Sequence, residues 1–149
     1  ETGRKVSIER EIFPLIVDDR RLFAMATDDY WIDTGRPEPY RRANLDMIDG
    51  VRRRMSAPGV ENGADVHPTA LIEHSLVSSG AVVAPGASVQ DSVILAGAIV
   101  HEGALVRDSI VMGTVGARAT IIDTVVGVAG VIPEGATLEH AFVPDPTAV

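Results

Sequence analysis

The residue whose type and setting best suit chemistry is Asp33, in the stretch YWIDTGRPEPY (residues 30–40). An aromatic pair leads into the carboxylate, Thr34 and Gly35 follow, and Pro37 suits the first turn of a predicted helix. A carboxylate that ends a strand lies at the carboxyl edge of a sheet, where ligands bind in open α/β folds. Such a residue either takes part in ligand binding or caps the following helix, and its position alone does not separate the two roles.

Four histidines form two pairs, His67 with His101 and His74 with His140, and each pair shares a column of an internal repeat. A catalytic histidine would act as a general base on an acceptor hydroxyl or amine, beside a groove for an acyl donor. The repeat contains no extended loop to build that groove. A three-histidine zinc site is also disfavoured, because nothing in the spacing selects three of the four. We expect exposed histidines at turns.

A column of acidic residues runs through the same repeat, in the order His74, Asp91, Asp108, Asp123 and His140. Carboxylates stacked one coil apart repel each other, which raises the pKa of at least one of them. The column is therefore a weak cation site, or a series of turns in which each carboxylate accepts a local backbone N–H. We favour the turns.

A basic cluster stands out in this acidic chain: Arg41, Arg42, Arg52, Arg53 and Arg54. It could hold a phosphate or an acidic partner surface. We favour a simpler interpretation, the solvated face of a helix and of the linker that follows it.

These side chains must be positioned by the repeat that occupies residues 66–143. Three columns step by 17, 17, 15 and 17 residues, and five hexapeptides share Ala at their fifth position. The columns are Val66, Val83, Val100, Val115, Ile132; Ile72, Val89, Val106, Ile121, Leu138; and Ser75, Ser92, Ser109, Thr124, Ala141. This pattern predicts a left-handed parallel β-helix of about five coils, each with three short strands, stacked about 4.8 Å apart.

Details of the repeat predict where its corners lie. Gly86, Gly103 and Gly135 precede the shared Ala, where the chain must turn sharply. The 15-residue step removes two residues between Ser109 and Val115, so one corner of the prism should be pinched there. In the tail, residues 144–149, two prolines would block an extra strand.

The first 60 residues predict mixed α/β structure. Ser7 can cap a helix that Pro14 keeps short or kinked. RLFAMAT (21–27) and YWID (30–33) are strand candidates. A second helix should run from Pro37 to a stop at Gly50, with its apolar stripe on Tyr40, Ala43, Met47, Ile48 and Val51. Residues 51–65 are a predicted linker.

Composition excludes several classes of protein. The 149 residues carry a net charge of −8, which argues against nucleic-acid binding. There is no cysteine, so disulfides and thiol chemistry are excluded. No apolar run is long enough to span a membrane, and the charged start is not a signal peptide. We expect a cytoplasmic protein that binds neither nucleic acid nor membrane.

Three motifs in a fixed order resemble one enzyme family: VSIEREIFP (6–14), YWIDTGRPEPY and RANLDMIDG (42–50), followed by the hexapeptides. They resemble the C-terminal part of sugar-1-phosphate nucleotidylyltransferases, most closely the mannose-1-phosphate guanylyltransferase branch. The resemblance implies that residues 1–50 are the C-terminal piece of a Rossmann-like α/β nucleotidyltransferase domain. That domain would make GDP-mannose and pyrophosphate from GTP and mannose 1-phosphate, and the β-helix would serve homo-oligomerisation or regulation.

The same resemblance implies roles for individual residues. Asp33 matches the family's metal-binding aspartate and would help to hold Mg²⁺, which neutralises the phosphates during attack on the α-phosphorus. Gly35 lets the backbone pass close to the substrate, and Glu9 lines the sugar end. In one departure, Arg36 stands where the family usually has Thr. If its side chain points inward, it meets a phosphate.

A larger departure is that the family's G-x-G-T-R-L nucleotide loop does not occur in these 149 residues. We therefore expect the chain to begin partway through the catalytic domain and to be inactive alone, with GTP and mannose 1-phosphate bound through the missing N-terminal part. Base specificity is not readable from this part. Two other classes stay open: a non-catalytic β-helix assembly module and, less favoured, a hexapeptide acyltransferase.

Overall fold

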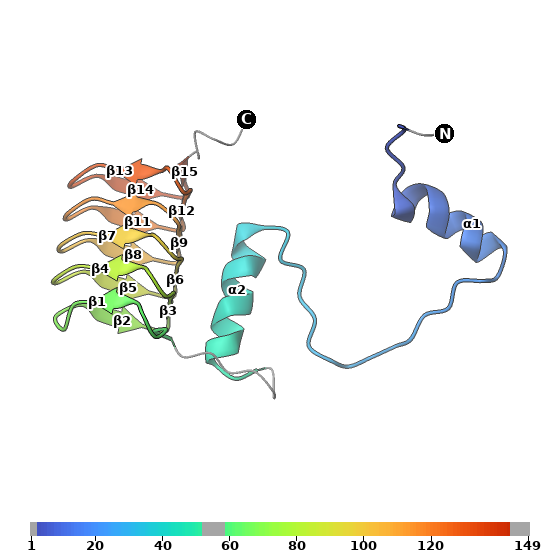
Figure 1. Cartoon of the computed structure of the whole chain (residues 1–149), viewed down its shortest axis with the longest axis horizontal. Coiled ribbons are helices and arrows are strands. Elements are labelled where there is room, and N and C mark those ends of the chain that lie inside the picture. Colours follow the sequence, from blue (N-terminus) through green and yellow to red (C-terminus); the bar gives the residue numbers. More distant parts are fainter. Residues whose placement is uncertain (1–2, 52–58, 144–149) are drawn as a thin grey trace.

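The computed structural model describes residues 3–51 and 59–143, and its main body is a three-sided β-solenoid (Figure 1). Each coil contributes one strand to each of three parallel sheets, and each sheet has five strands. The chain thus winds five times around one axis, as the repeat predicts. A single coil leaves its inner face uncovered, so the stacking of neighbours creates the core.

The three sheets contain every third strand of the solenoid. The first sheet holds β1 (Asp65–Val66), β4 (Val82–Val83), β7 (Ile99–Val100), β10 (Thr114–Val115) and β13 (Val131–Ile132). The second holds β2 (Leu71–Glu73), β5 (Ser88–Gln90), β8 (Leu105–Arg107), β11 (Thr120–Ile122) and β14 (Thr137–Glu139). The third holds β3 (Leu76–Val77), β6 (Val93–Ile94), β9 (Ile110–Val111), β12 (Val125–Val126) and β15 (Phe142–Val143).

The register of the sheets confirms the predicted columns. Val66 pairs with Val83, and Val83 pairs with Val100, at the 17-residue steps. Val100 pairs with Val115 across the 15-residue step. Pairing begins earlier than predicted, with a bridge between Val60 and Val77. The stretch predicted as a linker therefore supplies the first rung of the solenoid.

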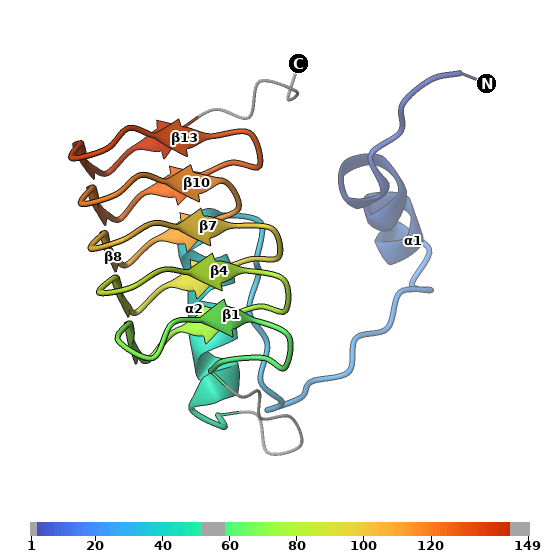
Figure 2. The ribbon, with the colours of Figure 1, turned by 60° about the vertical axis from the view of Figure 1, so that its left-hand side comes forward.

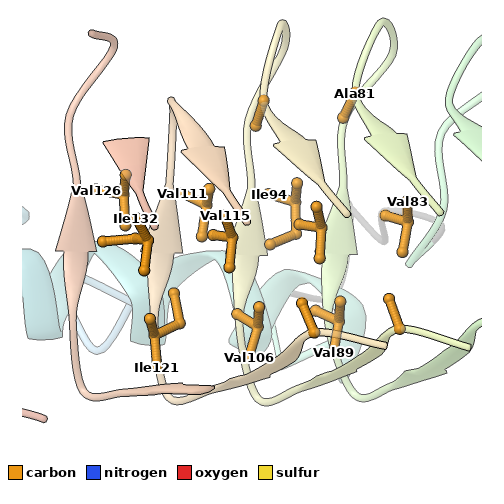
Figure 3. Packing of buried hydrophobic residues seen from close by; sticks show 14 of the residues in the cluster. Ala81, Val83, Val89, Ile94, Val106, Val111, Val115, Ile121, Val126 and Ile132 are labelled. Carbon is orange, nitrogen blue, oxygen red and sulfur yellow. The ribbon is translucent and has the colours of Figure 1, made fainter. Parts of the chain in front are cut away.

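The core consists of small and β-branched side chains that stack from coil to coil (Figure 3). Val83, Val100 and Val115 are at most 1% exposed on the first sheet, and equivalent columns line the second and third sheets. Fully burying such a side chain contributes about 1.5–3 kcal/mol. The shared Ala is equally buried, as at Ala87 and Ala104. Repetition of this small contribution, rather than a few large rings, stabilises the solenoid.

A buried hydroxyl ladder runs along one corner. Each hydroxyl donates to the carbonyl two residues earlier, as Ser92 does to Gln90 at 2.6 Å. The three serine hydroxyls also accept the backbone N–H of the counterpart residue in the next coil, as Ser92 does from Ser109 at 3.0 Å. The ladder comprises Ser75, Ser92, Ser109 and Thr124. It satisfies backbone donors that the corner would otherwise leave unpaired.

The predicted pinch lies between β9 and β10. That connection has two residues, Met112 and Gly113, whereas the equivalent connections in the neighbouring coils have four. Gly113 occupies the place of the buried Ala98, because Ile99 and Thr114 are register partners. The shortened corner brings the backbone of the next coil so close that no side chain fits at Gly113.

The N-terminal part contains a π-helical turn, η1 (Ile8–Ile12), then α1 (Phe13–Asp18) and α2 (Pro37–Ile48). The Ser7 hydroxyl accepts the N–H of Arg10, which confirms the predicted cap. The two predicted strands are wrong for this chain: residues 21–27 and 30–33 form no strand. A strand needs a neighbour to satisfy its backbone, and the described residues offer none there.

Helix α2 packs against the outer surface of the third sheet, beside the stacked coils (Figures 1 and 2). Tyr40 and Ile48 contact an outward-facing apolar column formed by Leu76, Val93 and Ile110. Helix boundaries agree with prediction, and Gly50 adopts a φ of 68° just beyond the end. The predicted apolar stripe is corrected at Val51, which is exposed.

Candidate functional site

The candidate site is the turn that carries Asp33, directly before α2. The Gly35 N–H donates to Asp33 Oδ1 at 2.9 Å, so the carboxylate closes the turn. Asp33 is exposed, and a carboxylate has acceptor capacity beyond this one bond. This bond closes a turn before α2 and does not cap the helix, because the N-cap residue of α2 is Arg36 and no side chain caps it. The turn leaves Asp33 accessible to a cation.

An open cavity of about 530 Å³ surrounds this turn. Trp31, Asp33 and Gly35 line it together with the cationic side chains of Arg36 and Arg42. Glu38 adds a second carboxylate to the lining. Guanidinium donates in a fork that matches phosphate oxygens, so this mixed lining can accommodate a metal-bound phosphate. The Arg42 side chain is 71% exposed, which agrees with the predicted solvated face. The six-residue spacing from Arg36 gave no signal that the two side chains share a cavity.

A second carboxylate, Asp46, ties this turn to α2. Asp46 is buried, and it accepts hydrogen bonds from Tyr30 Oη at 2.7 Å and from Arg42 Nε at 2.7 Å. Burial works to raise the pKa of Asp46, but these two bonds and the Arg42 charge outweigh it and lower the pKa below its ordinary value. Sequence reasoning missed Asp46, because a carboxylate within a helix usually faces solvent.

Arg41 anchors α2 to the solenoid. It donates to the carbonyl oxygen of Asp91 at 2.8 Å and to Asp108 Oδ1 at 2.9 Å. Its side chain is only 20% exposed, so the predicted solvated face is wrong for Arg41. Residues 52–54 of the predicted basic cluster lie outside the described residues.

His74 makes a second anchor between the solenoid and α2. Its Nδ1 lies 2.6 Å from Asp91 Oδ1, and its Nε2 lies 3.0 Å from Asp49 Oδ1, at the end of the helix. Only a protonated imidazole donates from both nitrogens. The bond to Asp91 raises the pKa of His74, burial lowers it, and the Asp49 charge and bond raise it, with a net upward shift.

This anchor predicts a pH-dependent contribution to stability. Because the folded-state pKa of His74 is raised, the contribution is complete below the unfolded pKa of about 6.5 and is lost as pH rises through the folded value. We expect His74→Gln to lower the free energy of unfolding by no more than about 1 kcal/mol at pH 5.5, since the group is partly exposed. The difference between the two proteins should shrink above pH 6.5.

Thermal unfolding of both proteins from pH 5.5 to 8.5 measures this difference. His67→Gln is a matched control, because Nδ1 of His67 contacts the Thr69 hydroxyl at 2.9 Å rather than a carboxylate. A His74→Gln deficit that stays constant across this range would contradict the prediction.

The acidic column is a set of turns, as favoured, but its carboxylates have other partners than predicted. Every member has a left-handed φ, between 41° and 52°, in the series His74, Asp91, Asp108, Asp123 and His140. The hydrogen-bond partners of these carboxylates are side chains from other coils or from α2. Asp123 Oδ2, for example, lies 2.7 Å from His140 Nδ1. The prediction of local N–H acceptance is corrected, because the left-handed corner aims these side chains along the solenoid axis.

The histidines sit at exposed positions, as predicted. Within residues 3–51 and 59–143, no three His, Asp or Glu side chains are arranged to hold a metal ion. Connections between successive strands have only two or four residues, so no loop in the described solenoid builds an acyl-donor groove. The geometry does not favour acyltransferase chemistry.

The structure does not bring all the predicted site residues together. Asp33 and Gly35 share the turn, whereas Glu9 is exposed in η1. The stretch that includes η1 and α1 lies apart from α2 in both views (Figures 1 and 2). The role of Glu9 at a sugar site therefore stays a prediction.

The coiled sheets, the stacked aliphatic columns and the Ala-bearing hexapeptides define a β-solenoid of the hexapeptide class. The chain belongs to the family described as GlmU-like, C-terminal hexapeptide, whose model matches residues 60–145. No helix in the described part of the chain is long and apolar enough to cross a membrane.

The chain is also similar to the C-terminal region of mannose-1-phosphate guanylyltransferases. It is 35% identical over 78 residues to the enzyme of Mycobacterium tuberculosis, covering 47% of this chain and 22% of the relative. It is 36% identical over 72 residues to a probable mannose-1-phosphate guanylyltransferase of Oryza sativa, covering 48% of this chain and 20% of the relative. It is 34% identical over 74 residues to the mannose-1-phosphate guanylyltransferase catalytic subunit beta of Danio rerio, covering 46% of this chain and 21% of the relative. The chain thus spans about a fifth of the length of these relatives.

Proposed function

We propose that this chain is the C-terminal part of a mannose-1-phosphate guanylyltransferase-like enzyme. Residues 1–50 complete a Rossmann-like nucleotidyltransferase domain, and a left-handed solenoid follows it. The whole enzyme joins GTP and mannose 1-phosphate into GDP-mannose and pyrophosphate. The relatives support this proposal, and so does the candidate site in the motif that precedes α2.

One observation carries the proposal: an uncovered apolar segment leads directly into Asp33. Phe23 and Met25 are each 88% exposed, and Trp31 is 81% exposed. Contiguous apolar exposure of this kind marks a surface that another part of a protein covers. A sheet supplied by an N-terminal catalytic domain would pair with this segment and bury these side chains.

The residues of the turn fit a Mg²⁺ ion. Mg²⁺ is commonly held by one or two carboxylates, with waters and substrate phosphates as the remaining ligands. Asp33 supplies one accessible carboxylate, and Gly35 holds it in place through the turn bond. The ion would neutralise the phosphate charge that builds up as the sugar phosphate attacks. No further ligand from the described part of the chain is required.

Other residues of the chain act by binding and by support. Arg36 and Arg42 face the cavity and are suited to phosphate oxygens of the substrate. The solenoid carries α2 on its third sheet and serves homo-oligomerisation or regulation. Exposed Leu71 and Leu105, which lie on the second sheet, favour an assembly surface.

The test is to purify the natural protein from which the chain derives and to measure its mass and its turnover. We expect a mass more than twice 15.8 kDa and Mg²⁺-dependent pyrophosphate release from GTP and mannose 1-phosphate. A mass near 15.8 kDa without turnover would instead identify an assembly module. Binding of acetyl-CoA would identify an acyltransferase.

A further inference from the structure

Asp46 is the buried charged residue of the described chain, and its surroundings single it out. A buried carboxylate is costly unless it is paired and hydrogen-bonded. Here both oxygens are used, Oδ2 by the Tyr30 hydroxyl and Oδ1 by Arg42. Arg42 is a near neighbour on the same helix, whereas Tyr30 lies sixteen residues earlier. The bond to Tyr30 therefore joins α2 to a segment without regular structure of its own.

That bond fixes one flank of the Asp33 turn. Tyr30 precedes Asp33 by three residues, and Pro37 begins α2 four residues after it. The stretch between them is thus held at both ends by the same helix. Inside it, the Asp33–Gly35 hydrogen bond closes the turn. Few conformations satisfy all three restraints, so the direction of the Asp33 carboxylate is set by α2.

The helix in turn is fixed to the solenoid. Arg41 donates to the Asp91 carbonyl and to Asp108, and His74 bridges Asp91 and Asp49. Tyr40 and Ile48 add apolar contacts on the third sheet. The solenoid, a rigid stack of paired strands, is therefore the support against which the turn is held.

We propose that Asp46 is a positioning residue, which acts through the Tyr30 hydroxyl to hold the Asp33 turn in the orientation that binds a metal–phosphate ligand. The metal-binding role of Asp33 rests on the proposed function. The hydrogen-bonded connection does not rest on the proposed function. It runs from the solenoid through Arg41 and α2 to Asp46, Tyr30 and the turn. The two parts are therefore tested separately.

The first test measures the mobility of Trp31, the only tryptophan of the chain and the neighbour of Tyr30. Time-resolved fluorescence anisotropy is recorded for the 149-residue chain and for Tyr30→Phe, Asp46→Ala and the double variant. We expect the amplitude of nanosecond local motion to increase in both single variants. The double variant should show no further increase, because either change breaks the same bond.

Two controls accompany this measurement. Asp28→Ala makes the same substitution at an exposed carboxylate in the segment that carries Tyr30, and it should leave Trp31 motion unchanged. Circular dichroism melting of Tyr30→Phe reports whether the solenoid is intact, and the loss of one hydroxyl on a partly exposed ring should leave it so. Unchanged Trp31 motion in Tyr30→Phe with an intact solenoid overturns the proposal.

The second test uses the natural protein and its turnover. We expect Tyr30→Phe to weaken the apparent Mg²⁺ affinity by about 10-fold or more, the size of effect seen for groups that orient metal ligands. An unchanged Mg²⁺ dependence also overturns the positioning role. Full turnover in Asp33→Asn would instead overturn the proposed function, and it would leave the anisotropy result standing.

Discussion

Replacing Asp33 by Asn in the natural protein is expected to lower Mg²⁺-dependent pyrophosphate release by roughly 100-fold or more. This change keeps an oxygen at Oδ1, so the hydrogen bond from the Gly35 N–H at 2.9 Å is retained. It removes the negative charge that a hard cation prefers in a ligand. Loss of metal-assisted charge stabilisation of about 3 kcal/mol corresponds to a rate loss of about 100-fold.

The choice of Asn separates the two roles of this carboxylate. If Asp33 only closes the turn, Asp33→Asn behaves like the unmodified protein, and Asp33→Ala, which loses the turn bond, is impaired. If Asp33 binds the metal, both variants are equally inactive. The control is Asp28→Asn, which neutralises another carboxylate of the same segment, five residues before Asp33. Activity is measured across a Mg²⁺ titration, and a normal titration curve for Asp33→Asn would contradict the metal role.

Much of the solenoid could be predicted, because its structure is periodic in the sequence. Each coil repeats the environment of its neighbour, so a column of Val or Ile at equal steps predicts which residues pair between strands. Val66, Val83 and Val100 are register partners as the spacing requires. The two-residue deletion also predicted a local feature, the short corner at Gly113.

The contacts between the solenoid and α2 could not be predicted in the same way. Arg41 and Asp108 are 67 residues apart in the sequence, and nothing local marks them as partners. A helix with charged residues on one side predicts solvent exposure unless a neighbour is known to cover that side. Asp46 and Tyr30 were missed for this reason, since their pairing depends on how a loop folds back over α2.

The segment before Asp33 shows a different limit. RLFAMAT has the composition of a strand, and composition is a local property, whereas a strand requires a partner. The described chain provides no partner there, so the segment has no regular secondary structure and its apolar side chains are exposed. In the proposed enzyme, the N-terminal domain would supply the partner strands that this segment lacks.

A second large effect is expected at the short corner of the solenoid. Gly113→Ala should destabilise the protein by about 3 kcal/mol, the cost of forcing an atom into a packed interior. A Cβ at this position would overlap the carbonyl oxygens of Gly127 and Gly130, which are backbone atoms of the next coil. The φ of Gly113 is not in the left-handed region, so the expected cost comes from space rather than from backbone conformation.

The matched control is Ala98→Gly, in the preceding coil. Ala98 is fully buried at the equivalent position, where the four-residue connection leaves room for a methyl group. Removing that methyl should cost about 1.5 kcal/mol, from lost burial and added chain entropy. For a solenoid of this size we expect Gly113→Ala to lower Tm by about 12–24 °C, and Ala98→Gly by roughly half as much. An unchanged Tm for Gly113→Ala would mean that the Gly127–Gly130 turn moves aside. The short corner would then not be the reason for glycine at this position.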